Sequence, residues 1–189
     1  MDAIEALNTR STAKTFGSAV PSKEHLEIVL QAAVRAPDHG RLRPWRFMLI
    51  EGDQRRKLGD LLAASALRRV PTLGAGDLQR ERDKALRAPL IIMVACRIVP
   101  GTKIPAIEQL MAAGAAAQNI LLALHAQGYV AAWKTGEAAY DTEVKRSLGL
   151  AADDHIVGFI YTGRGAGATL AVGKPANVQD AMLEFPEAR

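Results

Sequence analysis

Cysteine is almost absent from this sequence, since the chain of 189 residues contains one, Cys96. A single thiol can form neither an internal disulfide nor a cysteine-based zinc site, so the reducing cytoplasm is the expected compartment. Cys96 lies inside the apolar run 90–96, which predicts a buried, inert thiol. The N-terminal stretch Met1-Asp2-Ala3-Ile4-Glu5 is acidic rather than basic and then apolar, so we expect neither secretion nor organelle import.

Aromatic residues are also scarce, at 5% of the chain, although the net charge is +4. A platform on which single-stranded bases could stack is therefore poorly supplied, and a basic charge alone is weak evidence for nucleic-acid binding. The cationic residues crowd two short segments, 10–14 and 35–46, which suits a phosphate-bearing small ligand as well as a polyanion. A non-catalytic, nucleic-acid-binding dimer stays an alternative, and it predicts a colourless protein with salt-dependent DNA binding.

Several ligand-binding motifs are missing as well. The phosphate loop G-x-x-x-x-G-K-[ST] does not occur, because Lys174 is followed by Pro175, and H-E-x-x-H is absent. The histidines show no ligand spacing, so we expect no metal site; they are His25, His39, His125 and His155. The segment 163–168 (GRGAGA) matches the loose G-x-G-x-x-G/A fingerprint, but Gly173 and Pro175 leave no room for the helix that should follow. We interpret it as a Gly-rich turn.

The longest apolar segment runs from Pro105 to Gly128 and is rich in alanine, the best helix former. Apolar residues cover nearly every face of the expected helix, which is typical of a helix buried all round. A membrane span is the competing interpretation. Polar residues leave no uninterrupted run of about 18 apolar residues; they are Glu108, Gln109, Gln118, Asn119 and His125. We therefore predict a central, buried helix and no membrane association.

Shorter elements surround this helix. We expect helices at 2–7, 22–34, 53–69, 77–86 and 141–148, with caps at Asp2, Ser22, Asp53 and Asp141, and strands at 45–50, 88–96, 129–133 and 155–161. A mobile loop is expected at 70–76. Interleaved helices and strands indicate an α/β or α+β protein in which helices cover a sheet. No repeat or boundary divides the chain.

Three polar clusters could carry chemistry. Thr9-Arg10-Ser11 offers a guanidinium and two hydroxyls, which suit a phosphate, although a solvent-exposed loop fits the composition equally well. The second cluster, Arg35 to His39, could equally serve to satisfy the end of a helix. Trp133-Lys134-Thr135-Gly136 follows a strand, where open sheets often bind ligands, but a core Trp and a polar turn would look the same.

Taken together, the clusters resemble a known family. The pattern R-A-P-D-H-x-x-x-x-P-W-x-F, an N-terminal R-S, and a strand ending W-K-T-G are similar to the nitroreductase family of FMN flavoproteins, in particular its short NAD(P)H nitroreductase branch. The resemblance runs from Met1 to about Gly163. It implies an α+β fold with a central, mostly antiparallel sheet flanked by helices, a long buried central helix, and an intertwined homodimer with FMN in the interface. Residues 1–163 would form the FMN-binding domain and 164–189 an extended tail on the dimer partner.

The resemblance also implies which residues bind the cofactor: Thr9, Arg10, Ser11, Arg35, His39, Trp133, Lys134 and Thr135. Arg10 and Ser11 would hold the ribityl phosphate, and residues 133–135 would reach the flavin from the other subunit. Residues 123–128 would lie near the nicotinamide nucleotide. The common family loop reads A-P-S-x-x-N-x-Q-P-W, whereas this chain has Asp38, Arg41 and Arg43 at the three polar positions, a difference that bears on substrate choice.

The implied activity is electron transfer from NADH or NADPH, through FMN, to a nitroaromatic or quinone-like small-molecule acceptor. The flavin would carry the chemistry, so no side chain is named as a general acid or base, and Arg35 or Lys14 would stabilise the reduced ring. A specialised flavoenzyme on the same fold, for dehalogenation or cleavage of the flavin ring, is the other enzymatic alternative. It would differ near residues 70–86.

Overall fold

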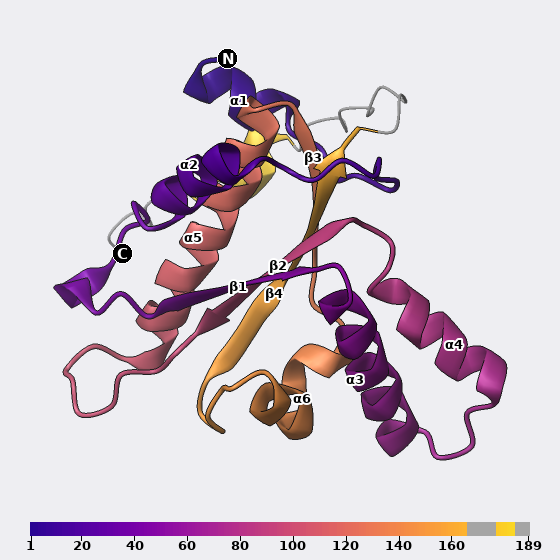
Figure 1. Cartoon of the computed structure of the whole chain (residues 1–189). Helices are drawn as coiled ribbons and strands as arrows, with labels where there is room; N and C mark the ends of the chain where they lie inside the picture. Colours follow the sequence, from indigo (N-terminus) through magenta and orange to yellow (C-terminus); the bar gives the residue numbers. More distant parts are fainter. Residues whose placement is uncertain (166–176, 184–189) are drawn as a thin grey trace.

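The computed structural model describes residues 1–165 and 177–183, and a four-stranded sheet organises them (Figure 1). The strands are β1 (Trp45–Glu51), β2 (Leu90–Cys96), β3 (Tyr129–Lys134) and β4 (His155–Arg164). Their order is β1-β2-β4-β3, and every neighbouring pair is antiparallel. The predicted α+β class and antiparallel sheet are confirmed.

Helices cover both faces of the sheet. One face carries α2 (Lys23–Ala33) and α5 (Ala106–Ala126), with α1 (Ala3–Thr9) packed on α5. The other carries α3 (Gln54–Arg69) and α6 (Thr142–Ser147), with α4 (Ala75–Lys84) packed on α3. Figure 1 shows these two groups on opposite sides of the strands. We call the two sides the α5 face and the α3 face. The described residues also form three short 3-10 helices: η1 (His39–Arg41), η2 (Glu137–Tyr140) and η3 (Val178–Ala181).

Most predicted boundaries are confirmed. The side chains of Asp2, Ser22 and Asp141 each accept a hydrogen bond from a backbone N–H of the helix that they precede. The capping role predicted for Asp53 is wrong, because this residue is itself in the right-handed helical region and makes no capping hydrogen bond. The loop predicted at 70–76 is shorter, since α4 begins at Ala75. Of the predicted tail, 166–176 and 184–189 lie outside the described residues.

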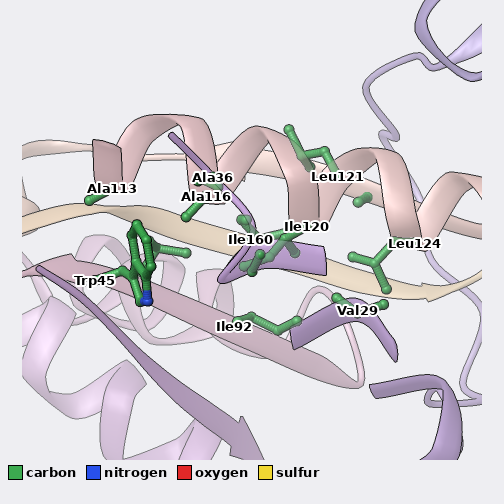
Figure 2. Packing of buried hydrophobic residues seen from close by; sticks show 14 of the residues in the cluster. Val29, Ala36, Trp45, Ile92, Ala113, Ala116, Ile120, Leu121, Leu124 and Ile160 are labelled. Carbon is green, nitrogen blue, oxygen red and sulfur yellow. The ribbon is translucent and has the colours of Figure 1, made fainter. Parts of the chain in front are cut away.

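The alternation of side chains along the strands divides the core in two. In β2, Ile92 and Val94 point to the α5 face, whereas Ile91 and Met93 point to the α3 face, so the strand is buried on both sides. This arrangement explains why the sequence of β2 reads as an unbroken apolar run. Figure 2 shows the larger cluster, in which α5 packs over the strands and against Trp45. Cys96 belongs to this cluster, and burial raises the pKa of its thiol to about 11.

Helix α5 is buried along one side only, so the prediction of burial all round is wrong for the single chain. The buried side packs on the sheet and α2; it comprises Gln109, Ala112, Ala113, Ala116, Ala117, Ile120, Leu121 and Leu124. On the other side Ile107 and Met111 are 61% and 67% exposed. By length and composition α5 could span a membrane, but within this fold it is a core helix.

The polar residues of α5 hold neighbouring parts of the chain. The buried amide of Gln109 accepts from the Val99 N–H at 2.8 Å and donates to the carbonyls of Val99 and Ile104, both at 3.2 Å. Asn119 donates to the Ala32 carbonyl near the end of α2 at 3.0 Å. His125 contacts Thr9 at the end of α1 at 2.8 Å. These side chains therefore fix the loop before α5 and two helices.

We predict that Gln109→Leu destabilises the protein by about 1–3 kcal/mol, because the Val99 N–H would lose its partner in a buried site. Equilibrium denaturation in urea measures the change. Gln118→Leu is the matched control, since Gln118 lies on the same helix and its side chain makes no hydrogen bond within residues 1–165 and 177–183. An equal or larger loss in the control would contradict the role given to Gln109.

Candidate functional site

A pocket of about 870 Å³ opens on the α3 face of the sheet. Its floor includes Phe159 and Tyr161 of β4, and one wall comes from α3 and α4. The opposite wall comes from the segment 12–16 and from the end of β3 with the turn after it, 132–138. We call this hollow the α3-face pocket. Its volume lies within the range that small-molecule and cofactor sites occupy.

The N-terminal segment reaches the pocket because it pairs with the sheet edge. Thr12 forms a parallel bridge with Ala131, and the Ala13 N–H donates to the Ala131 carbonyl at 2.9 Å. Gly17 then donates to the Arg164 carbonyl at the end of β4 at 2.7 Å. These bonds carry Lys14 and Phe16 over the end of β3, where Lys134 and Thr135 also lie.

Trp133 and Lys134 point to opposite faces of the sheet. The Trp133 indole packs with the α5-face cluster and donates to the Val157 carbonyl at 3.1 Å. It lies directly over Gly158, where an added Cβ would stand 2.1 Å from the indole nitrogen. The neighbouring Lys134 is therefore on the pocket side of β3. Trp133 therefore has a structural role, whereas Lys134 and Thr135 border the pocket.

The α3-face pocket is cationic. Five basic side chains line it against two carboxylates, Glu81 and Glu137; the basic residues are Lys14, Arg69, Lys84, Arg87 and Lys134. Lys84 bonds both carboxylate oxygens of Glu81, at 2.5 and 2.6 Å. The remaining cations leave a net positive charge that suits an anionic ligand.

Thr9, Arg10 and Ser11 lie just before the residues that line the pocket, and all three are partly buried. The Thr9 hydroxyl donates to the Glu5 carbonyl at 2.7 Å, so it must accept the hydrogen of His125 Nε2. Burial and the nearby Arg10 guanidinium lower the pKa of His125, while Glu5 acts in the opposite direction. Thr9 therefore holds the end of α1 against α5, with Arg10 beside it.

Arg35 and His39 lie on the α5 face instead. Arg35 lines a second hollow of about 280 Å³ together with Arg41, Arg43, Asp38 and Trp45 of the α5-face cluster. His39 Nδ1 contacts the Glu108 carboxylate at the start of α5 at 2.6 Å. The predicted clusters 9–11 and 133–136 are thus near the α3-face pocket, whereas the cluster 35–39 is on the other side of the sheet. One chain does not bring all the predicted residues together.

The loop that carries this second hollow has an unusual backbone. Gly40, Arg41 and Arg43 have φ values of 71°, 56° and 50°. Glycine adopts this left-handed region freely, whereas each arginine there costs about 1–2 kcal/mol. The Arg43 N–H donates to the Asp38 carboxylate at 2.6 Å, and the Arg46 guanidinium donates to the Arg43 carbonyl at 2.8 Å. Asp38, one of the departures from the family loop, thereby stabilises the turn.

Sequence reasoning missed the far side of the pocket. Arg69, Lys84 and Arg87 come from α3, α4 and the link to β2, and only the packing of those elements brings them to the site. Phe159 and Tyr161 carried a signal, because their spacing of two in a strand places both on one face. The sequence does not indicate which face of the sheet carries the pocket.

Comparison with known proteins identifies the chain. The model of the nitroreductase family matches residues 7–164. The chain belongs to the nitroreductase family. YdjA of Escherichia coli strain K12, provisionally named an NAD(P)H nitroreductase, is 36% identical over 165 residues, which cover 86% of this chain and 88% of YdjA. A Haemophilus influenzae protein with the same provisional name is 35% identical over 166 residues, 87% of this chain and 89% of its own.

Solved nitroreductase structures share the fold. A nitroreductase-like protein from Bacillus cereus superposes with a TM-score of 0.84 at 23% identity, covering 99% of this chain and 97% of that one. A Desulfovibrio desulfuricans protein, provisionally described as a nitroreductase and solved in complex with FMN, has a TM-score of 0.72 at 26% identity, with coverage of 98% and 97%. The nitroreductase-like fold predicted from the sequence is therefore confirmed.

We predict that Arg10→Gln raises the pKa of His125, because it removes the positive charge that disfavours the imidazolium. NMR titration of the His125 ring measures this shift. In the wild type a lowered pKa means that the neutral ring is favoured in the folded state, so the associated stability is lost as the pH falls through the usual histidine range. Arg56→Gln, a change on α3, is the control. An unchanged His125 titration in Arg10→Gln would show that the two side chains do not interact.

Proposed function

We propose that this nitroreductase-family protein is an FMN-dependent oxidoreductase that takes electrons from NADH or NADPH and passes them to nitroaromatic or quinone-like acceptors. The observation that carries the proposal is the cationic α3-face pocket, which the N-terminal segment and the end of β3 border in one chain. The names of the relatives and the FMN complex of the D. desulfuricans protein support it. We expect it to act in the cytoplasm.

The residues of the pocket fit such a cofactor. Lys14 and Lys134 offer positive charge at the sheet edge, and Thr12 and Thr135 offer hydroxyls beside them. The apolar side chains of Phe16, Leu62 and Phe159 give a planar ring a surface on which to pack. A volume of about 870 Å³ can hold a flavin and leave room for a second ligand.

The chain contributes binding and charge rather than a proton shuttle. FMN, when bound, supplies the hydride and electron transfer. Lys14 provides a cation that favours negative charge on a bound ring, Arg10 and Ser11 bind the phosphate, and Thr135 helps orient the cofactor. Phe16 and Phe159 exclude water from the apolar side of the pocket.

We further propose that the working unit is a homodimer. Arg35 and His39 lie on the α5 face, on the other side of the sheet from the α3-face pocket of their own chain, so in our proposal they contact the pocket of a second copy. Residues 133–135 follow Ala131, which pairs with Thr12 in the same chain. We therefore propose that the Arg35–His39 loop, rather than residues 133–135, crosses to the partner.

Exposed apolar side chains support a dimer through the α5 face. The helices on that side carry large apolar residues that are at least half exposed: Ile4, Leu7, Ile28, Ile107 and Met111. Contiguous apolar surface marks interaction sites, and we propose that these side chains contribute to one such surface in the dimer. The half-exposed side of α5 would then be covered by the partner, which would restore the burial that its composition indicates.

We predict that the purified protein is yellow and that Lys14→Gln and Arg10→Ala each weaken FMN binding about tenfold or more, as expected for the loss of a charge-assisted hydrogen bond. Fluorescence titration of the apoprotein with FMN measures the Kd. Lys57→Gln, which removes an exposed lysine of α3, should bind FMN as the wild type does. A wild-type protein that fails to bind FMN at saturation, or that binds it without oxidising NADH or NADPH in the presence of nitrofurazone or menadione, would refute the proposed function.

We predict that Met111→Arg converts the dimer to a monomer, because a charge would be placed in an apolar interface. The variant should stay folded and lose FMN, since half of the site would be gone. Light scattering after gel filtration gives the mass, and circular dichroism checks the fold. Leu67→Arg, an exposed apolar position on α3, is the matched control and should stay dimeric. A dimeric Met111→Arg variant with full FMN content would contradict the proposed interface.

A further inference from the structure

The Tyr161 hydroxyl is a polar group that the proposed cofactor site does not use. Tyr161 is 8% exposed, lies on the α3 face of β4, and lines the α3-face pocket. Its ring packs near Phe16, with 6.5 Å between the ring centroids. Within residues 1–165 and 177–183 its hydroxyl makes no hydrogen bond, and protein atoms do not fully enclose it. A hydroxyl in this position suits a ligand in the pocket.

Arg87 lines the same pocket as this tyrosine. It lies three positions before the first residue of β2, and the register of the sheet pairs Ile91 with Tyr161, which brings the link before β2 toward the pocket. Burial raises the pKa of Tyr161 and the positive charge of Arg87 acts against that rise, so the phenol stays protonated and can donate. In the described part of the chain, the Arg87 guanidinium forms no ion pair.

The surrounding wall adds positive charge. Lys84 is neutralised by Glu81, but Arg69 at the end of α3 lines the pocket without an ion pair to any described residue. The other carboxylate of the pocket, Glu137, lies in the turn after β3. Arg69 and Arg87 therefore add positive charge to the pocket in which the Tyr161 hydroxyl offers a hydrogen-bond donor.

We propose that Tyr161 and Arg87 bind an anionic group, a carboxylate or phosphate, of the acceptor, and that this enzyme prefers acceptors in which such a group accompanies the reducible one. The proposal rests on the proposed function and specifies its substrate class. A guanidinium and a phenol that line one pocket can both donate to one oxyanion, and charge-assisted hydrogen bonds are stronger than those between neutral groups. A neutral acceptor would leave this part of the wall without a partner.

Two acceptors of nearly equal shape test the preference: 4-nitrobenzoate, which is anionic, and 4-nitrobenzamide, which is neutral. We expect the wild-type holoenzyme to favour 4-nitrobenzoate in kcat/KM. Arg87→Gln and Tyr161→Phe should each reduce that preference about tenfold, mainly through the KM for 4-nitrobenzoate. Arg87→Lys should restore part of it, and Arg56→Gln, on α3 and paired with Asp53, should leave it unchanged.

A binding measurement complements the kinetics. Benzoate cannot be reduced as a nitro group is, so its binding to the oxidised holoprotein, followed through the visible flavin spectrum, reports the anion site alone. We expect benzoate to bind more tightly than benzamide in the wild type, and about tenfold more weakly in Arg87→Gln than in the wild type. Tyr161→Phe keeps the packing of the ring and tests the hydroxyl even if Arg87 variants fold poorly.

The outcomes separate the possible sources of the anion. An equal loss with both acceptors, or unchanged benzoate binding in both variants, would overturn the proposal. A raised KM for NADH or NADPH with unchanged acceptor kinetics would assign the site to the dinucleotide phosphates, and a raised Kd for FMN would assign it to the cofactor phosphate; both would overturn it. If the wild type reduces neither acceptor and no quinone, the proposed function fails, whereas reduction of 4-nitrobenzamide without any preference refutes the anion site only.

Discussion

Three polar side chains on α5 fix the parts of the chain on which the site depends. Gln109 holds the loop that leads from β2, Asn119 holds the end of α2, and His125 holds Thr9 at the end of α1. Each of these bonds is partly buried, so the loss of one partner would be costly. The helix therefore does more than fill the core: it sets where the chain leaves α1 for the pocket and where it leaves α2 for the Arg35–His39 loop.

The sheet then determines which of the predicted site residues can lie close together in one chain. The segment after α1 pairs with Ala131 on the β3 edge and passes Lys14 to the α3 face. The loop after α2 leads into β1 on the α5 face, where Trp45 is buried. A four-stranded sheet with both faces covered separates the two groups, because no side chain reaches through it. A site that uses both groups needs two copies of the chain, and the incomplete burial of α5 provides a surface on which they could join.

Much of the fold could be predicted because its signals are local. Ser22 and Asp141 cap helices by hydrogen bonds to residues two or three positions away, and the apolar run of β2 reflects burial on two faces. The Asp53 prediction failed because the backbone there is already helical, which composition does not reveal. The candidate site is less predictable. Its motif residues could be named from the family pattern, but the assignment of Arg87 and Tyr161 to one hollow depends on how α4 packs and how β2 registers with β4.

The distribution of charge shows where the net charge of +4 is located on the molecule. The two hollows together are lined by eight basic residues and three acidic ones, a balance of +5, whereas the whole chain carries +4. The remaining residues therefore carry a net charge close to zero. The excess positive charge is concentrated in concave sites of about 870 and 280 Å³. Two arginines of the smaller hollow, Arg41 and Arg43, have left-handed backbone conformations, and hydrogen bonds of the Arg43 backbone with Asp38 and Arg46 help to hold this turn. Charge confined in this way favours small anionic ligands.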